Sequence, residues 1–155
     1  MRKHFRVKRF LLFTLASLTV ASGASANSDS STLTVEIDGL KNRQGQICVS
    51  IFASSQGFPS SASNAVQNQC VPITNKSEQV TFRNLKPGSY AVSALHDTKG
   101  DQKIHRNILG IPTQGFGFSS NPTILTGPPK FGDSAFLVAG PNTNIQIQLI
   151  YLLGG

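Results

Sequence analysis

The sequence predicts an all-β fold, an antiparallel β-sandwich of about seven strands interrupted by one long irregular loop. Three observations support this prediction: short segments alternate apolar and polar residues, clusters of turn-forming residues separate them, and no amphipathic helix of useful length is present. A closed barrel is the alternative arrangement for such strands. We expect a single domain over residues 33–152, a length that supports one modest hydrophobic core.

In the first half of this domain, apolar residues recur at every second position. Leu33, Val35 and Ile37 alternate with polar residues, which predicts a half-buried strand from residue 33 onward. A turn containing two glycines follows over residues 39–45. The next strand is expected over residues 46–53, where the same alternation resumes.

The remaining elements follow from the same signals. The Ser- and Asn-rich segment 54–68 is interpreted as a loop with a short helical turn near 63–67. Because Pro72 has no backbone N–H, the strand over 69–74 is expected to be an edge strand or a bulged strand. Period-two alternation predicts the other strands, over residues 79–83, 89–96, 134–138 and 144–152.

The N-terminal segment is typical of a secretory signal peptide. Five of the 14 basic residues lie in the first nine positions, an apolar run follows from Phe10 to Ala21, and small residues lead to Ala24-Ser25-Ala26. An uncleaved anchor is the alternative, but the apolar run is shorter than a membrane span requires. We expect a signal peptide over 1–26, cleaved after Ala26, and a flexible leader over 27–32. The mature chain would then be periplasmic or extracellular, with no membrane span.

Removal of this segment changes the charge of the chain. The full sequence has a formal net charge of +7, which by itself would favour a polyanionic partner. Without residues 1–26, nine basic residues face seven acidic ones, and the net charge falls to +2. We therefore expect no nucleic-acid partner.

Two cysteines remain in the mature chain. Cys48 and Cys70 form an even pair in a chain expected to be exported, so we predict a disulfide bond between them. Two buried free thiols are the alternative. Thiol catalysis has no support, because the sequence has no C-x-x-C motif and no histidine beside either cysteine.

The turn L-x-P-G-x-Y, which contains Pro87, Gly88 and Tyr90, is a structural signature. Pro and Gly form a tight turn, and the Tyr90 hydroxyl can then bond back to the turn backbone, as in the tyrosine corner of sandwich domains. The motif resembles the one in transthyretin-like and carboxypeptidase-regulatory-like sandwiches, which points to an immunoglobulin-like or transthyretin-like sandwich. It indicates fold and not function.

The long irregular loop, residues 97–133, is the candidate functional segment. Irregular loops of this length are uncommon in compact domains and often carry binding roles. Its phenylalanines lie among glycines and prolines, with amide side chains nearby, and could line a ligand site. The candidate ligand-binding residues are Asn107, Gln114, Phe116, Phe118, Asn121 and Phe131. The alternative is that these rings only fasten the loop to the sandwich.

Several motifs together resemble a known family. The L-x-P-G-x-Y turn, the H-D-x-x-G-D stretch from His96 and the G-I-P-x-x-G-F-G-F-S-x-N run from Gly110 are similar to those of the bacterial domain-of-unknown-function 2141 family. The likeness extends over about Leu33 to Leu152 and includes Gly57-Phe58-Pro59 and the pair Pro129 and Phe131. The resemblance implies a small exported β-sandwich protein, and it implies no assigned activity.

The start of the loop is also a candidate metal site. Family members often place oxygen ligands at alternate positions here, as in a Ca²⁺ loop. In this sequence Lys99 takes one such position and His105 another, which disfavours Ca²⁺. His96, Asp97, Asp101 and His105 could instead bind a transition metal. The alternative is that the two aspartates cap turns and His96 ends a strand.

These observations favour an exported, non-enzymatic β-sandwich binding module that contacts a small ligand or an envelope protein through residues 97–133. The first alternative is a metal-dependent enzyme or metal-binding protein centred on His96, Asp97, Asp101 and His105. The second is a structural component of the envelope. No hydrolase, zinc-protease or nucleotide-binding motif is present, and the sequence requires no cofactor.

Overall fold

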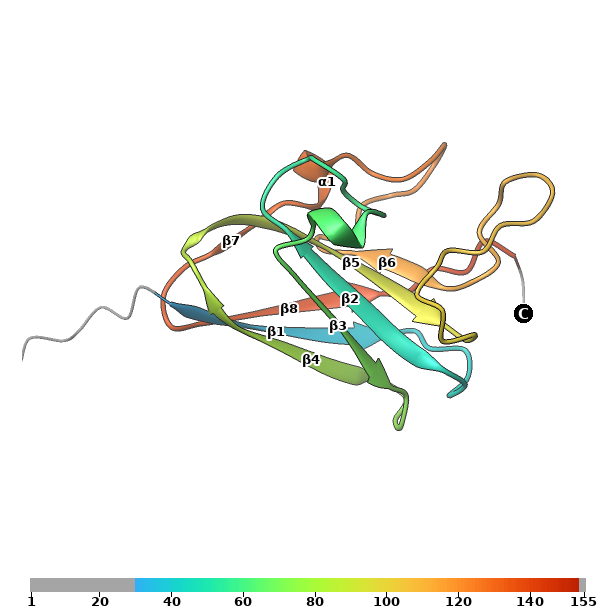
Figure 1. The fold of residues 1–155 in the computed structure, drawn as a ribbon, viewed down its shortest axis with the longest axis horizontal. Coiled ribbons are helices and arrows are strands. Elements are labelled where there is room, and N and C mark those ends of the chain that lie inside the picture. Colours follow the sequence, from blue (N-terminus) through green and yellow to red (C-terminus); the bar gives the residue numbers. More distant parts are fainter. Residues whose placement is uncertain (1–29, 154–155) are drawn as a thin grey trace, which may run out of the picture.

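A computed structural model describes residues 30–153 of the chain. The predicted signal peptide, residues 1–26, lies outside the described residues. The all-β prediction is confirmed: the described part of the chain forms eight strands in two packed sheets (Figure 1), with two very short helices. No described helix is long and apolar enough to cross a membrane.

The smaller sheet has the strand order β4-β1-β8. It contains β1 (Ser31–Asp38), β4 (Glu78–Leu85) and β8 (Asn142–Gln148). Strand β1 begins two residues earlier than the alternation from Leu33 predicts, so the end of the expected leader belongs to the sheet. It pairs antiparallel with β4 and parallel with β8, which makes this sheet mixed rather than purely antiparallel.

The larger sheet has the order β3-β2-β5-β6. It contains β2 (Gln46–Phe52), β3 (Gln67–Pro72), β5 (Gly88–Asp97) and β6 (Phe116–Phe118), and β7 (Phe136–Val138) pairs with the start of β5. As expected from Pro72, β3 lies at the sheet edge. The predicted disulfide is confirmed, because Cys48 and Cys70 lie directly opposite each other on β2 and β3 and are bonded.

Two short helices lie in the connections. The 3-10 helix η1 (Ala62–Asn64) lies close to the predicted helical turn in the segment between β2 and β3. The four-residue helix α1 (Phe131–Ser134) precedes β7 and was not predicted, so β7 starts at Phe136 rather than at residue 134. Both helices lie at the end of the larger sheet where β2 ends and β5 begins (Figure 1), and there the rings of Phe58 and Phe131 meet with centroids 6.0 Å apart.

The core lies between the two sheets and contains the predicted alternating residues. Leu33, Val35 and Ile37 are fully buried, and so are the inward-facing apolar residues of β2. The predicted tyrosine corner is present, since the Tyr90 hydroxyl donates a hydrogen bond to the Lys86 carbonyl at 2.8 Å. The sequence alternation therefore correctly predicted the buried face of the strands in which it occurs.

Strand β6 is the main departure from the sequence prediction, because it lies inside the segment expected to be irregular. Gly115, which precedes this strand, and Gly117, its central residue, both face the other sheet. A Cβ atom on Gly115 would approach the Tyr151 ring to 2.4 Å, and one on Gly117 would approach Ile147 Cγ2 to 2.6 Å. Only glycine fits at these two positions, and the side chains of Phe116 and Phe118 consequently point to the outer face.

We predict that Gly117→Ala destabilises the fold by about 1–3 kcal/mol, because the added methyl group must push β6 away from β8. Gly132→Ala is the matched control, since a Cβ at Gly132 meets nothing within 4 Å. The free energies of unfolding are measured by chemical denaturation. Equal stabilities for the two variants would contradict this role of Gly117.

Candidate functional site

A groove crosses the outer face of the larger sheet, away from the core. It consists of two adjoining compartments with volumes of about 380 and 370 Å³. Both compartments are lined by the same six residues, which we call the shared wall: Pro59, Ser60, Ile104, Arg106, Phe116 and Phe118. The volumes lie in the range typical of small-molecule sites.

The first compartment lies over the sheet itself. Its floor consists of outward-facing residues of β2, β3 and β5, including the Cys48–Cys70 disulfide, Ser93 and Leu95. The Ser93 hydroxyl donates a hydrogen bond to the Pro59 carbonyl at 2.8 Å, which fastens the β2–β3 loop above this floor. Gln102 and Lys103 come from the opposite side of the groove.

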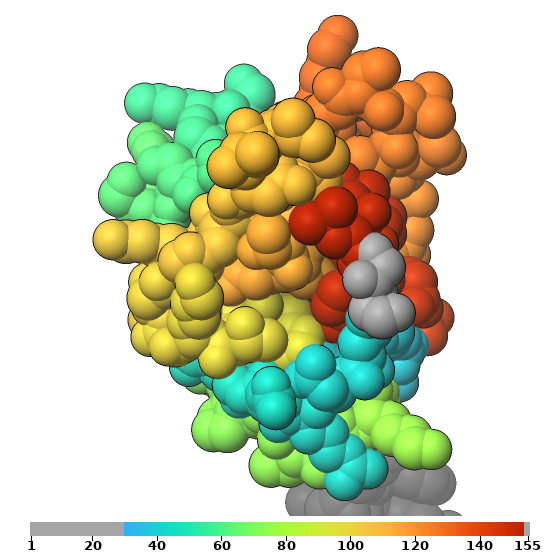
Figure 2. Space-filling view, turned by 90° about the vertical axis from the view of Figure 1, so that its right-hand side faces the viewer, coloured from blue at the N-terminus to red at the C-terminus, as the bar shows by residue number. Residues whose placement is uncertain are grey.

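The second compartment is more apolar and lies between three segments of the chain. Its walls are residues 110–112, residues 124–128 and Leu152, together with the shared wall. The corresponding segments lie side by side on the face seen in Figure 2, where the loop after β5 projects between the β2–β3 loop, the 122–130 segment and the C-terminal residues. Leu125 is 85% exposed at the rim of this compartment.

Of the three predicted aromatic ligand residues, two line the groove. Phe116 and Phe118 are in contact, with ring centroids 5.7 Å apart, and Phe118 also meets Phe58 at 6.0 Å. Phe131 does not line the groove and packs against Phe58 instead. Phe58 in turn meets the fully buried Phe52, so these rings also join the loops to the core.

The three predicted amide ligands lie outside the groove and organise the backbone. Asn107 Oδ1 accepts hydrogen bonds from the amides of Leu109 and Ile111, both at 3.0 Å. Asn121 joins its loop to β8, because its Oδ1 accepts from the Gln148 amide and its Nδ2 donates to the Gln146 carbonyl. Asn107 and Asn121 therefore hold in place the loops that carry the groove residues, but they do not line the groove themselves.

Gln114 lies in a different hollow, of about 210 Å³, which is also lined by Lys41, His96 and Tyr151. Its Oε1 accepts a hydrogen bond from the His105 amide at 2.8 Å. Its Nε2 is one of two buried side-chain atoms in the described residues that lack a hydrogen-bond partner. Gln114 therefore supports the loop that carries His105 and does not reach the groove.

The four candidate metal ligands are not assembled around one point. His96 is buried, its Nε2 donates to the Gln44 carbonyl at 2.8 Å, and its Nδ1 is hydrogen-bonded to the Tyr151 hydroxyl at 2.7 Å. Burial raises the pKa of Tyr151, although the Lys41 amide opposes this effect, so Tyr151 keeps its proton at neutral pH. Both ring nitrogens of His96 are thus already engaged.

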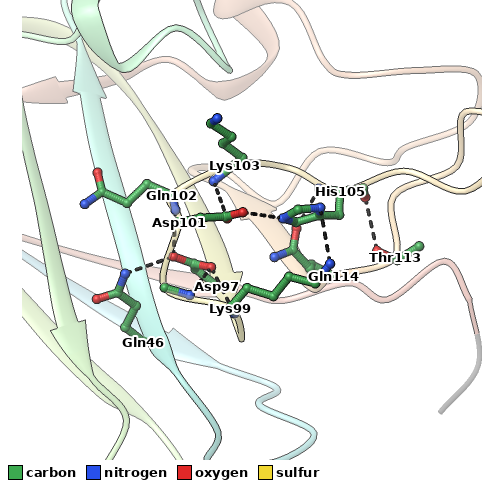
Figure 3. A network of polar contacts seen from close by, with 10 residues as sticks. Gln46, Asp97, Lys99, Asp101, Gln102, Lys103, His105, Thr113 and Gln114 are labelled. Atoms are coloured by element: carbon green, nitrogen blue, oxygen red, sulfur yellow. Dashed lines mark hydrogen bonds and ion pairs between the residues drawn. The ribbon is translucent and has the colours of Figure 1, made fainter.

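Asp97 is fully buried and organises the start of the loop, as Figure 3 shows. Its Oδ2 accepts hydrogen bonds from Gln46 Nε2 and the Gln102 amide, and its Oδ1 accepts from the amides of Lys99 and Gly100. Burial alone would raise the pKa of this carboxyl group, but the four hydrogen bonds outweigh it and the pKa lies below its ordinary value.

Asp101 and His105 are the two candidate metal ligands that do meet. Asp101 Oδ2 lies 2.7 Å from His105 Nε2, and Lys99 Nζ lies 3.5 Å from His105 Nδ1 (Figure 3). Within residues 30–153, no three His, Cys, Asp or Glu side chains are grouped so that they could hold a metal ion. The hydrogen bonds of Asp97 and Asp101 instead match the alternative interpretation, in which both aspartates organise turns.

The groove also contains residues that were not among the six individual candidates, although some of them lie inside the predicted contact segment 97–133. These are Pro59 and Ser60 from the β2–β3 loop, Ile104 and Arg106 from the loop after β5, and the segment 124–128. A signal for them exists in the sequence. Large aliphatic residues occur inside otherwise polar, Gly- and Pro-rich loops, and many of these are exposed.

We predict that Asp97→Asn destabilises the fold by about 1–3 kcal/mol at neutral pH, because the new amide N–H₂ faces other donors. Since the folded-state pKa of Asp97 is lowered, its carboxylate stabilises the fold above the unfolded-state pKa, and this contribution is lost as the pH falls through the folded-state value. The stability difference between the native protein and the variant should therefore shrink in acid, as measured by denaturation at several pH values. Glu36→Gln provides the control for the loss of one negative charge. A stability difference between the native protein and Asp97→Asn that does not change with pH would contradict this role of Asp97.

The chain was compared with protein families, curated proteins and solved structures. No match is found among curated proteins or among solved structures. A family model described as "Uncharacterized protein conserved in bacteria (DUF2141)" matches residues 35–146, from within β1 to within β8. The match covers more than half of the chain and includes the loop that forms the groove, and the protein is therefore a member of the DUF2141 family.

Proposed function

We propose that this protein is an exported, non-enzymatic binding module that holds a small apolar ligand in the groove. The observation that carries the proposal is the second compartment, where Phe116, Phe118 and Ile104 form a wall beside the exposed Leu125. A concave apolar site with few polar groups is the usual form of a small-molecule site.

The chemistry of the groove supports binding rather than catalysis. Among the described residues that line it there is no His, Asp or Glu, and its two cysteines are joined in a disulfide. The serines of the lining therefore have no histidine or carboxylate beside them in the groove to act as a base. The lining offers apolar surface, backbone groups and two cations, which suit the retention of a ligand.

The scaffold around the groove also supports this proposal. The Asp97 carboxylate fixes the loop after β5, and Asn121 attaches the 122–130 segment to β8. The opposite wall is attached by the hydrogen bond from Ser93 to Pro59. Because each wall is tied to a strand, the groove is largely formed before a ligand enters, which reduces the entropic cost of binding.

We predict that the neutral apolar dye N-phenyl-1-naphthylamine binds the mature protein with saturable fluorescence enhancement. Replacing two exposed groove residues, in the variant Ile104→Asp with Leu125→Asp, should weaken this binding at least about tenfold, because charge replaces apolar contact area. The matched control is Val66→Asp with Leu137→Asp, which alters exposed apolar residues outside the groove. An absence of saturable binding, or equal binding by both double variants, would contradict the proposal.

Export rests on the basic and apolar segment before Ala26 and is consistent with the disulfide. We predict that the protein recovered from a periplasmic or culture fraction begins at Asn27. N-terminal sequencing and intact mass measure this directly. A recovered chain that begins at Met1 or Arg2 would exclude cleavage.

A further inference from the structure

The charged side chains that line the groove in the described residues are both cationic. Lys103 lines the first compartment and Arg106 lines both, whereas no Asp or Glu lines either one in the described residues. The one ion pair in the described part of the chain joins Asp101 to His105. Among residues 30–153, neither Lys103 nor Arg106 therefore has a carboxylate partner within 4 Å.

Arg106 is held by its backbone and by one guanidinium nitrogen, and the hydrogen bonds found among residues 30–153 leave the other guanidinium N–H groups available. Its backbone forms a β-bridge with Pro112, and its Nη1 donates to the Gly110 carbonyl at 2.8 Å. A guanidinium group has five N–H donors, so donors remain for an anionic group in the groove. The Lys103 side chain projects away from the Asp97–His105 network (Figure 3) and lines the same groove.

The apolar and cationic parts of the groove are adjacent. Ile104, Phe116 and Phe118 line both compartments, and Arg106 lies with them at the junction. The second compartment continues from this junction along Ile111, Ile124 and Leu152. A ligand that fills this compartment can therefore present one end to Arg106 without burying an unpaired charge.

We propose that the ligand is a free anionic amphiphile, a medium-chain fatty carboxylate, with its alkyl chain in the second compartment and its carboxylate at Arg106 and Lys103. This inference rests on the proposed binding function and adds the chemical class of the ligand. The aliphatic and aromatic walls select an alkyl chain. The two cations, which have no carboxylate partner among residues 30–153, select a negatively charged head, and a carboxylate can accept two parallel hydrogen bonds from a guanidinium group.

The experiment is a calorimetric titration of the mature protein with monomeric carboxylates from butyrate to decanoate, and with decan-1-ol as the neutral counterpart of decanoate. The affinity should rise about fourfold for each added CH₂ group, until the compartment is filled. Decanoate should bind about five- to tenfold more tightly than decan-1-ol, and added salt should reduce this preference.

Variants test the role of the two cations. Lys103→Gln with Arg106→Gln should reduce decanoate affinity about five- to tenfold and leave decan-1-ol affinity unchanged. The matched control, Lys76→Gln with Arg83→Gln, removes an exposed lysine and an exposed arginine that line neither compartment and should leave both affinities unchanged. Circular dichroism and thermal unfolding check that both double variants fold.

The contradicting outcomes separate this inference from the proposed function. If decan-1-ol binds as tightly as decanoate and the cation variant has no effect, the anionic class is wrong and the apolar groove function stands. If N-phenyl-1-naphthylamine binds and decanoate does not, the inference is again overturned alone. Binding to anionic lipid vesicles without binding to monomeric decanoate also overturns it. If neither the dye nor decanoate binds, both proposals fall.

Discussion

The close approach of β6 to the other sheet is the constraint on which the functional face depends. This approach requires glycine at positions 115 and 117, where a side chain would collide with Tyr151 and Ile147. Since neighbouring residues of a strand face opposite sides, Phe116 and Phe118 then have to point outward. One short strand therefore fastens the long insertion to the sandwich and places two aromatic rings in the groove.

The walls of the groove depend on polar anchors that were first considered as ligand or metal residues. The buried Asp97 carboxylate gathers three loop amides, and Asn107 and Asn121 close or attach the loops on the two sides of β6. Side-chain oxygens that bind backbone amides in this way hold irregular segments in place without regular secondary structure. Through these anchors, the position of Arg106 beside the phenylalanines is determined by the fold.

Much of the fold could be predicted from the sequence because its signals are local. Alternation at Leu33, Val35 and Ile37 indicates a strand and its buried face, and the turn before Tyr90 indicates the tyrosine corner. Strand β6 escaped prediction because three residues are too few to establish a period and its centre is a glycine, which is rare in strands. The parallel pairing of β1 with β8 escaped prediction because it joins the two ends of the domain, which no local pattern reports.

The candidate site was predicted only in part for a related reason. Phe116, Phe118 and Ile104 lie in the predicted contact segment 97–133, but their partners Pro59 and Leu152 come from distant segments that only the tertiary structure brings together. The most direct test of ligand binding in the groove is a map of backbone amide chemical shifts during titration of the mature protein with decanoate. The largest changes are expected at the amides of Ile104, Arg106, Phe116 and Phe118. Changes confined to the smaller sheet, with these four amides unaffected, would contradict binding in the groove.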